Sequence, residues 1–236
     1  MEPHASTETA RPQFFQEPFP HWRAQHQGIE VRFLGRGAPS SPVDALATLE
    51  LEPPQVAWLR QTHSARVRSA RPGACGEGDA LRTKLENLAL CVVTADCVPI
   101  ICSSSTTVVG IHAGWRGLAG GVIGAALTGP PGAKIAWIGP SIGPCCYEVG
   151  EEVAEQVVTA SDAAVLKPGT SGRPHLDLGL AAELQLRGLG VQTVHRVHEC
   201  TRCQPRLLWS YRRQGEARGR NLTFGWQTER DVSALS

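Results

Sequence analysis

The chain has 236 residues, 42% of them hydrophobic and 19% charged, a composition typical of a globular protein that buries a core. Its 23 lysines and arginines are nearly balanced by 22 aspartates and glutamates, and a net charge of +1 gives no electrostatic basis for binding nucleic acid or an anionic membrane. The sequence contains no run of about 18 apolar residues, so we expect no transmembrane helix.

Residues 1–25 lack the basic-then-apolar order of a signal peptide and are predicted to form a flexible tail. Eight cysteines without a secretion signal indicate reduced thiols, and we expect a cytoplasmic protein. Residues 26–236 show no internal repeat, low-complexity block or linker. We therefore expect them to form a single catalytic domain, and the protein to be a monomer.

Short apolar stretches rich in β-branched residues predict strands along the whole chain. In chain order these stretches are Gln55–Leu59, Leu88–Thr94, Pro99–Cys102, Thr107–His112, Ile135–Ile138 and Val191–Val197. The sequence CSSSTT between the third and fourth stretches has turn composition and predicts a hairpin.

Three segments between these strands have helical patterns, namely Gly117–Leu127, Glu151–Thr159 and Leu178–Arg187. Asp177 is placed to cap the third segment, and two acidic residues open the second. Hairpins alternating with strand–helix crossings predict an α/β (α+β) fold, a single layered domain with mixed β-sheets and outer helices.

Three side chains that bind metals or act as nucleophiles follow or end predicted strands. They are His63 in RQTHSARV, Cys97 in VVTADCVPI and His112 in GIHAGWRGL. Two histidines and one cysteine with an open fourth position form the ligand pattern of a catalytic zinc. Such a zinc would produce a nucleophile from water at neutral pH, and Asp96 is placed to orient one of the ligands.

A second group of cysteines allows several interpretations. The motif Cys200–Cys203, CTRC, is either half of a structural zinc site or a redox pair. The adjacent pair Cys145–Cys146 has poor geometry for two ligands of one metal, and His195 and His198 lie upstream as further candidates.

Arginines lie near the glycine-bearing segments and indicate an anion site. Arg116 follows His112 by four residues, Arg36 lies in the glycine-flanked turn FLGRGAPS, and one of Arg212 and Arg213 is expected to point inward. Because the chain has no Walker A or dinucleotide-binding glycine motif, a phosphate would be held by arginine and backbone groups.

The segments QTHSARV, GDALRT, TADCVPI, HAGWRGL, IGPCCYEVG, CTRC followed by WSYRR, and ARGR together resemble a known family. This is the laccase-domain or polyphenol-oxidase-like family, whose YfiH-type members are described as purine nucleoside phosphorylases and, in bacteria, as peptidoglycan-editing factors. The resemblance runs from about Arg36 to Arg220. It departs at GRGAPS, where the family turn reads Arg-x-Gly-Gly-x-Ser.

The resemblance implies a YfiH-like mixed-sheet fold, related to toxin deamidases that use a Cys–His pair. It implies a metal at His63, Cys97 and His112, Zn²⁺ or adventitious Cu²⁺, with the same three residues catalytic. The implied reaction is phosphorolysis of adenosine, inosine and methylthioadenosine to the free base and a ribose 1-phosphate, with adenosine deamination as a second activity. The residues expected to bind substrate are Arg36, Asp79, Arg116, Cys145 and Arg213.

Three other functions use the same residues. A metal-independent hydrolase acting on a cell-wall precursor would use Cys97 as nucleophile and His112 as base. A zinc-stabilised binding module would need a closed fourth ligand, for which Cys145 is the nearest candidate. A copper polyphenol oxidase is disfavoured, because the chain has eight histidines, no His-x-His pair, and Met1 as its one methionine.

Overall fold

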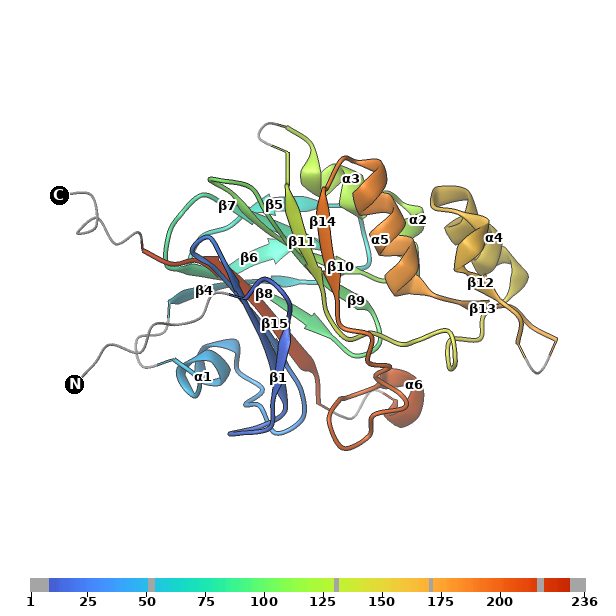
Figure 1. The fold of residues 1–236 in the computed structure, drawn as a ribbon, viewed down its shortest axis with the longest axis horizontal. Coiled ribbons are helices and arrows are strands. Elements are labelled where there is room, and N and C mark those ends of the chain that lie inside the picture. Colours follow the sequence, from blue (N-terminus) through green and yellow to red (C-terminus); the bar gives the residue numbers. More distant parts are fainter. Residues whose placement is uncertain (1–8, 51–53, 130–131, 170–171, 216–218, 230–236) are drawn as a thin grey trace.

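The computed structural model describes residues 9–50, 54–129, 132–169, 172–215 and 219–229. Two β-sheets pack face to face, the helices α2 to α5, between Trp115 and Gly188, cover the outer face of the smaller sheet, and α1, Pro42–Ala47, packs on the outer face of the larger one (Figure 1). This arrangement confirms the mixed α/β fold predicted from the sequence.

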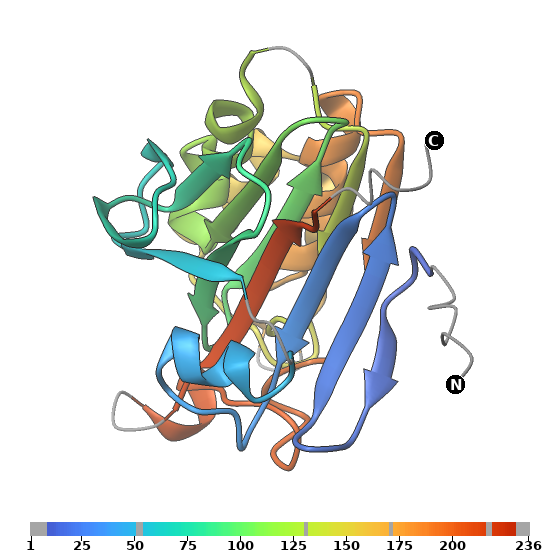
Figure 2. The same ribbon diagram turned by 90° about the vertical axis from the view of Figure 1, so that its left-hand side faces the viewer.

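The larger sheet has seven strands within the described ranges, in the order β1-β2-β3-β15-β8-β4-β6. Their bounds are β1 Gln13–Phe15, β2 His21–His26, β3 Ile29–Leu34, β15 Asn221–Gln227, β8 Leu88–Thr94, β4 Gln55–Arg60 and β6 Gly73–Glu77. Figure 2 shows β15, in red, beside the blue N-terminal strands. The C-terminal strand therefore joins β3 to β8 in the middle of this sheet.

The smaller sheet has six strands within the described ranges, in the order β14-β11-β9-β10-β7-β5. Their bounds are β14 Thr193–Arg196, β11 Ile135–Ile138, β9 Val98–Ser103, β10 Val108–Ala113, β7 Ala80–Thr83 and β5 Val67–Ser69. A separate pair is formed by β12 Leu166–Lys167 and β13 His175–Leu176.

The helices lie outside the two sheets (Figure 1). Their bounds are α1 Pro42–Ala47, α2 Trp115–Ala119, α3 Val122–Leu127, α4 Glu151–Ala160, α5 Leu178–Gly188 and α6 Tyr211–Gln214, with a 3-10 turn at Ala163–Val165. None of the helices in the described ranges has the length and apolar character needed to cross a membrane.

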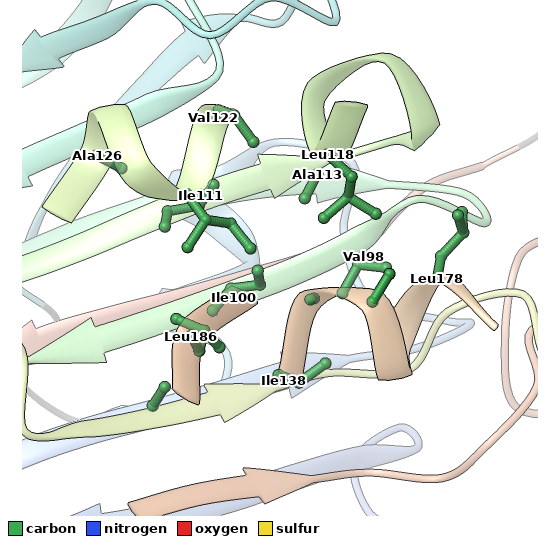
Figure 3. Close-up of a cluster of buried hydrophobic side chains, with 14 of the residues drawn as sticks. Val98, Ile100, Ile111, Ala113, Leu118, Val122, Ala126, Ile138, Leu178 and Leu186 are labelled. Carbon is green, nitrogen blue, oxygen red and sulfur yellow. The ribbon is translucent and has the colours of Figure 1, made fainter. Parts of the chain in front are cut away.

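Successive side chains of a β-strand point to opposite faces of its sheet. Neighbouring residues of one strand therefore lie in different hydrophobic cores. In β9, Val98 and Ile100 face the helices, whereas Ile101 lies between the two sheets. Figure 3 shows Leu118 of α2 and Leu186 of α5 in the core on the helical side. The central strands of the two sheets, such as β8, β9, β10 and β11, are thus buried on both faces, which explains the short continuous apolar runs in the sequence.

All six predicted strands are present, as β4, β8, β9, β10, β11 and β14, and β8 and β11 have the predicted bounds. The predicted hairpin is formed by β9 and β10, and the amide of Ser104 donates to the carbonyl of Thr107 at its turn (3.0 Å). Apolar β-branched runs therefore identified β8, β9, β10 and β11, whose side chains are nearly all buried, and also the more exposed β4 and β14.

Two of the predicted helices are confirmed as α4 and α5. Oδ1 of Asp177 accepts from the amide of Leu180 (2.9 Å), so Asp177 is the predicted N-cap. The third prediction, one helix over Gly117–Leu127, is wrong, because the segment forms the short helices α2 and α3. Gly121 between them has φ of 75°, a left-handed conformation that ends the first helix.

The prediction of a flexible tail over residues 1–25 is wrong for the described residues 9–25. Residues 13–15 and 21–26 form β1 and β2 at one edge of the larger sheet, where Trp22 and Ala24 are buried. The boundary set at residue 26 falls on the last residue of β2. Residues 1–8 lie outside the described residues.

Candidate active site

His63, Cys97 and His112 lie together where four strands end or begin. His63 follows β4, Cys97 lies in the turn between β8 and β9, and His112 is near the end of β10. Because β9 and β10 are antiparallel, with His112 opposite Pro99, the turn that carries Cys97 lies beside His112. Residues 34 and 15 positions apart in the sequence thus meet at one end of the sheets.

The three side chains are close enough to share one ion. Nε2 of His63 lies 3.8 Å from Sγ of Cys97, and the rings of His63 and His112 are 4.9 Å apart between centroids, at 76° to each other. One ligand atom from each residue lies within 4.8 Å of the other two. His112 is buried, Cys97 is half-buried and His63 is exposed, so the cluster opens to solvent on the His63 side.

Asp79 forms hydrogen bonds with the segments that carry both histidines. Its carboxylate accepts from Nδ1 of His112 (2.8 Å) and from the amides of Thr62 (3.2 Å), His63 (3.0 Å) and Ser64 (2.7 Å). His63 has φ of 58°, and this left-handed residue lets three successive amides converge on one anion. Burial opposes ionisation, but the hydrogen bonds from His112 and Ser64 hold the pKa of Asp79 well below its usual range.

The Asp79 contact also decides which nitrogen of His112 faces the cluster. An ionised carboxylate only accepts hydrogen bonds, so Nδ1 of His112 carries a proton and Nε2 is left for Cys97 or a metal. Burial disfavours the imidazolium, but Asp79 and Cys97 outweigh it and raise the pKa of His112 to about 9. Burial likewise disfavours the Cys97 thiolate, but His112 and His63 lower its pKa to about 7.

The cluster fits a metal ion such as Zn²⁺ or Cu²⁺. In a tetrahedral site with Zn–N and Zn–S bonds of about 2.0 and 2.3 Å, a nitrogen and a sulfur ligand lie roughly 3.5 Å apart. The 3.8 Å between Nε2 of His63 and Sγ of Cys97 is close to that separation. Asp79 supplies the carboxylate that commonly orients a metal-bound histidine.

Gly114 leaves room for this cluster. A Cβ atom at position 114 would lie 3.0 Å from Sγ of Cys97 and 3.1 Å from Cδ2 of His63. Since Gly114 is also the N-cap of α2, the backbone passes directly over the two ligands before the helix begins. Glycine is therefore required at position 114, because the backbone there closely approaches the side chains of Cys97 and His63.

The cluster forms one end of a pocket of about 840 Å³, a volume in the range of small-molecule sites. The pocket is lined by Leu59, Gln61, His63, Val93, Thr94, Ala95, Asp96, Cys97, His112, Trp115, Arg116, Tyr147, Tyr211, Arg212 and Arg220. Three of these residues are arginines, and Arg116 forms no ion pair with any residue that the structure describes. The pocket thus joins a candidate metal centre to three arginine side chains.

The side chains of the neighbouring residues Arg212 and Arg213 point to different places. Arg212 lines the pocket, where its Nη1 donates to the carbonyl of Glu148 (3.0 Å) and its guanidinium lies over Tyr147 (5.1 Å to the ring centroid). The Arg213 guanidinium donates instead to the carbonyls of Thr201, Arg202 and Leu208, all within 2.8 Å. The arginine expected to bind substrate, Arg213, therefore holds a loop together, and Arg212 faces the pocket.

Three other residues expected to bind substrate do not line the pocket. Asp79 has a fully buried side chain beneath the histidines. Arg36 lies over the ring of Trp209 (3.9 Å to the centroid) and donates to the carbonyl of Pro205. Cys145 lies with the other cysteines of its loop and of CTRC. Of the five residues, Arg116 alone is in the pocket wall.

Asp96 connects the turn that carries Cys97 to Thr201 and to the start of α6. Its Oδ1 accepts from the hydroxyl of Thr201 (2.5 Å), and its Oδ2 accepts from the amide of Arg212 (2.6 Å). Asp96 has φ of 98°, so the turn before Cys97 is tightly bent. The sequence placed Asp96 beside a ligand, and the structure shows that its carboxylate holds Thr201 and the first turn of α6 against that turn.

A family model described as multi-copper polyphenol oxidoreductase laccase matches residues 43–228. The chain belongs to this laccase family. The matched range contains the His63–Cys97–His112 cluster, Asp79 and the arginines of the pocket, and it confirms the family indicated by the sequence motifs.

Curated proteins with similar sequences carry the names of nucleoside-converting enzymes. The chain is 37% identical over 177 residues to a purine nucleoside phosphorylase of Pseudomonas aeruginosa, covering 72% of this chain and 73% of the relative. It is 33% identical over 182 residues to purine nucleoside phosphorylase YfiH of Escherichia coli, covering 74% of each. It is 36% identical over 189 residues to adenosine deaminase RL5 of an unknown prokaryotic organism, covering 70% and 72%. These names support an enzyme of the laccase family.

Solved structures of relatives have the same fold. A protein of Neisseria meningitidis, 29% identical, has a TM-score of 0.75 over 92% of this chain and 99% of that chain. YlmD of Geobacillus stearothermophilus, 26% identical, has a TM-score of 0.76 over the same shares. The laccase-family fold therefore extends over almost the whole chain.

Proposed function

We propose that the protein is a zinc-dependent purine nucleoside phosphorylase. It would cleave adenosine, inosine and methylthioadenosine to the free base and a ribose 1-phosphate or its methylthio form, and would deaminate adenosine as a second activity. The observation that carries the proposal is the pocket that joins the His63–Cys97–His112 cluster to three arginines. The phosphorylase and deaminase names of similar proteins support the same substrates.

Arginine is suited to the phosphate co-substrate, because its planar fork of donors matches phosphate oxygens and keeps its charge. Arg116 and Arg212 come from two different elements of the pocket wall, α2 and α6. Two guanidinium groups on separate elements can bind one dianion and hold an oxygen toward the sugar.

In phosphorolysis, a phosphate oxygen forms a bond to C1′ of the ribose as the bond from C1′ to the purine nitrogen breaks. The electron pair of that bond leaves with the purine, and the proton of hydrogen phosphate ends on the free base. Burial raises the pKa of Tyr147 to about 12, so this phenol stays protonated at neutral pH and can donate a hydrogen bond to the departing purine.

His63, Cys97 and His112 would hold the zinc ion, with Asp79 fixing His112 in the tautomer that leaves Nε2 free. The chemistry that zinc supplies in such a site is polarisation of a substrate atom and activation of water at neutral pH. In deamination, water replaces the amino group at purine C6 and ammonia leaves. One pocket can therefore serve both activities, with phosphate or water as the second reactant.

A metal-independent Cys–His hydrolase is the second candidate. The observation that favours it is the paired shift of Cys97 toward the thiolate, at a pKa of about 7, and of His112 toward the imidazolium, at a pKa of about 9. Such a pair is the usual form of a cysteine nucleophile with its acid. Its substrate would be an amide or ester, such as a cell-wall precursor.

Incubation with inosine, with and without phosphate and a chelator, distinguishes these functions. We expect hypoxanthine and ribose 1-phosphate in equal amounts, only when phosphate is present, and loss of both after chelation. Adenosine should in addition give inosine without phosphate. Failure to convert any nucleoside, with amide or ester hydrolysis that resists chelation, would favour the hydrolase.

A further inference from the structure

Four cysteines from two loops meet beside the pocket, outside its lining. Cys145 and Cys146 lie between β11 and α4, and Cys200 and Cys203 lie between β14 and α6. Sγ of Cys203 is 3.6 Å from Sγ of Cys145 and 3.4 Å from Sγ of Cys146. All four sulfur atoms lie within 4.8 Å of one another.

We propose that these four cysteines, the four-cysteine cluster, bind a structural zinc ion that is separate from the His63–Cys97–His112 cluster. A tetrahedron with Zn–S bonds of about 2.3 Å places its sulfur atoms roughly 3.8 Å apart. The distances from Cys203 to Cys145 and Cys146 are close to that value before any metal is added. Four thiolates with no open position form a common structural zinc site.

The backbone around Cys200 is arranged to stabilise a thiolate. The amide of Gly143 donates to Sγ of Cys200 at 3.2 Å. The amides of Cys203 and Gln204 both donate to the carbonyl of Cys200 (3.1 Å each), which folds CTRC into a tight turn with both sulfur atoms on one side.

A tight turn also allows the adjacent Cys145 and Cys146 to reach the same partner. The amides of Cys146 and Tyr147 both donate to the carbonyl of Gly143, so the chain turns back at the two cysteines. A Cβ atom at Gly143 would lie 3.3 Å from Sγ of Cys145 and 3.2 Å from Cβ of Cys200, which is close contact with both loops. The poor geometry expected of adjacent cysteines from the sequence is therefore overcome by this turn.

The proposed zinc would fasten two loops that also form the pocket. The amide of Thr201 donates to the carbonyl of Ser141 (3.0 Å), so the loops already touch beside the cluster. Tyr147 follows Cys146 directly, and Arg212, in the helix α6 that follows the second loop, donates to the carbonyl of Glu148. Zinc at the four-cysteine cluster would hold Tyr147 and Arg212 in the pocket wall without itself touching the substrate.

Metal content of the full chain tests the proposal without reference to activity. The protein and its variants are purified under reducing conditions, loaded with Zn²⁺ alone, desalted and analysed for zinc and protein. We expect Cys97→Ala to keep one tightly bound zinc per chain and Cys97→Ala combined with Cys203→Ser to keep none. Cys97→Ala combined with Cys75→Ser is the matched control and should keep one, because Cys75 belongs to neither cluster.

X-ray absorption on the zinc-loaded Cys97→Ala protein identifies the ligands. The proposal predicts sulfur neighbours alone, at about 2.3 Å. Nitrogen neighbours at about 2.0 Å, or a Cys97→Ala protein that binds no zinc while its thiols are reduced, would overturn it. So would iron or copper in place of zinc, or a disulfide from Cys203 to Cys145 or Cys146 in the protein purified with reductant.

A titration covers the case in which the Cys203→Ser protein does not fold. A mercurial thiol reagent is added stepwise to zinc-loaded Cys97→Ala, and released zinc is measured with a coloured chelator. Zinc release should follow modification of the four cysteines, which peptide mapping identifies. Release that follows modification of other thiols contradicts the proposal.

Discussion

Asp79 holds two parts of the candidate site with one carboxylate. It accepts from Nδ1 of His112 and from three successive amides of the loop that carries His63. The sequence resemblance implied that it binds substrate, but a fully buried side chain with these partners positions the two histidines instead. A buried carboxylate with this many donors is expected to matter for both stability and metal affinity.

Replacing Asp79 with Asn should lower metal affinity by roughly 10–100-fold, the usual effect of losing a group that orients a ligand. Because it leaves a buried charge without its partner, it should also lower the free energy of unfolding of the metal-free protein by about 3–5 kcal/mol. Zinc titration and urea unfolding measure the two effects. Wild-type affinity in the variant would contradict the assigned role.

The stability difference between the wild type and Asp79→Asn should depend on pH in the metal-free protein. The folded pKa of Asp79 lies below its usual 3.8, so its contribution is present above pH 3.8 and is lost as the pH falls below it. The folded pKa of His112 is raised from 6.5 to about 9, so its contribution is full below pH 6.5 and is lost as the pH rises through 9. We therefore expect the largest difference between pH 4 and 6.5, and a constant difference from pH 4 to 10 would contradict this account.

Gly114→Ala tests whether close approach to the ligands requires glycine. The new Cβ would lie 3.0 Å from Sγ of Cys97, so we expect weaker zinc binding with little change in the fold. Gly124→Ala in α3 is the control, because no atom lies within 4 Å of its added Cβ. The control should bind zinc normally and gain about 0.5–1 kcal/mol of stability from better helix propensity. Equal zinc affinity of the two variants would show that Gly114 is not needed.

The break between the short helices α2 and α3 depends on one residue, Gly121. Gly121 has φ of 75° between them, which separates α2, the helix that carries Arg116, from α3. Gly121→Ala should cost about 1–2 kcal/mol of unfolding free energy, because a side chain disfavours the left-handed conformation. Gly121→Asn should cost less, since Asn tolerates this region. Equal costs in urea unfolding would contradict the explanation.

The elements that the sequence predicted share a simple pattern. Several strands buried on both faces, such as β8 and β11, appear as continuous apolar runs, and Asp177 marks the start of α5 by its capping side chain. The strand β3 was missed because Glu30 and Arg32 interrupt its apolar residues. Both charged residues are buried and ion-paired to each other, a tertiary arrangement that no local pattern indicates.

The candidate site was predictable where residue type and strand ends coincide. His63, Cys97 and His112 each follow or end a predicted strand, and the structure brings them together. The choice between Arg212 and Arg213 depends on the side-chain directions in the four-residue helix α6, which the sequence does not specify. The four-cysteine cluster depends on contact between two loops that are more than 50 residues apart.

At the scale of the whole molecule, both candidate metal-binding clusters join segments that are distant in the sequence. A ligand that binds only the folded state stabilises it, by about 2.7 kcal/mol when its free concentration is 100 times the dissociation constant. Zinc added to chelator-treated wild-type protein should therefore raise the melting temperature by roughly 5–10 °C for each occupied site. Identical melting with and without zinc would show that neither cluster binds metal in the folded protein.

The central claim is that the pocket performs phosphorolysis at the His63–Cys97–His112 cluster. Its most direct test is release of hypoxanthine and ribose 1-phosphate from inosine by wild type and Cys97→Ala, matched for folding by circular dichroism. The account predicts phosphate-dependent release by the wild type and a rate at least about 100-fold lower in the variant, the scale of losing a positioned catalytic group. Phosphorolysis retained by a folded Cys97→Ala protein would contradict it.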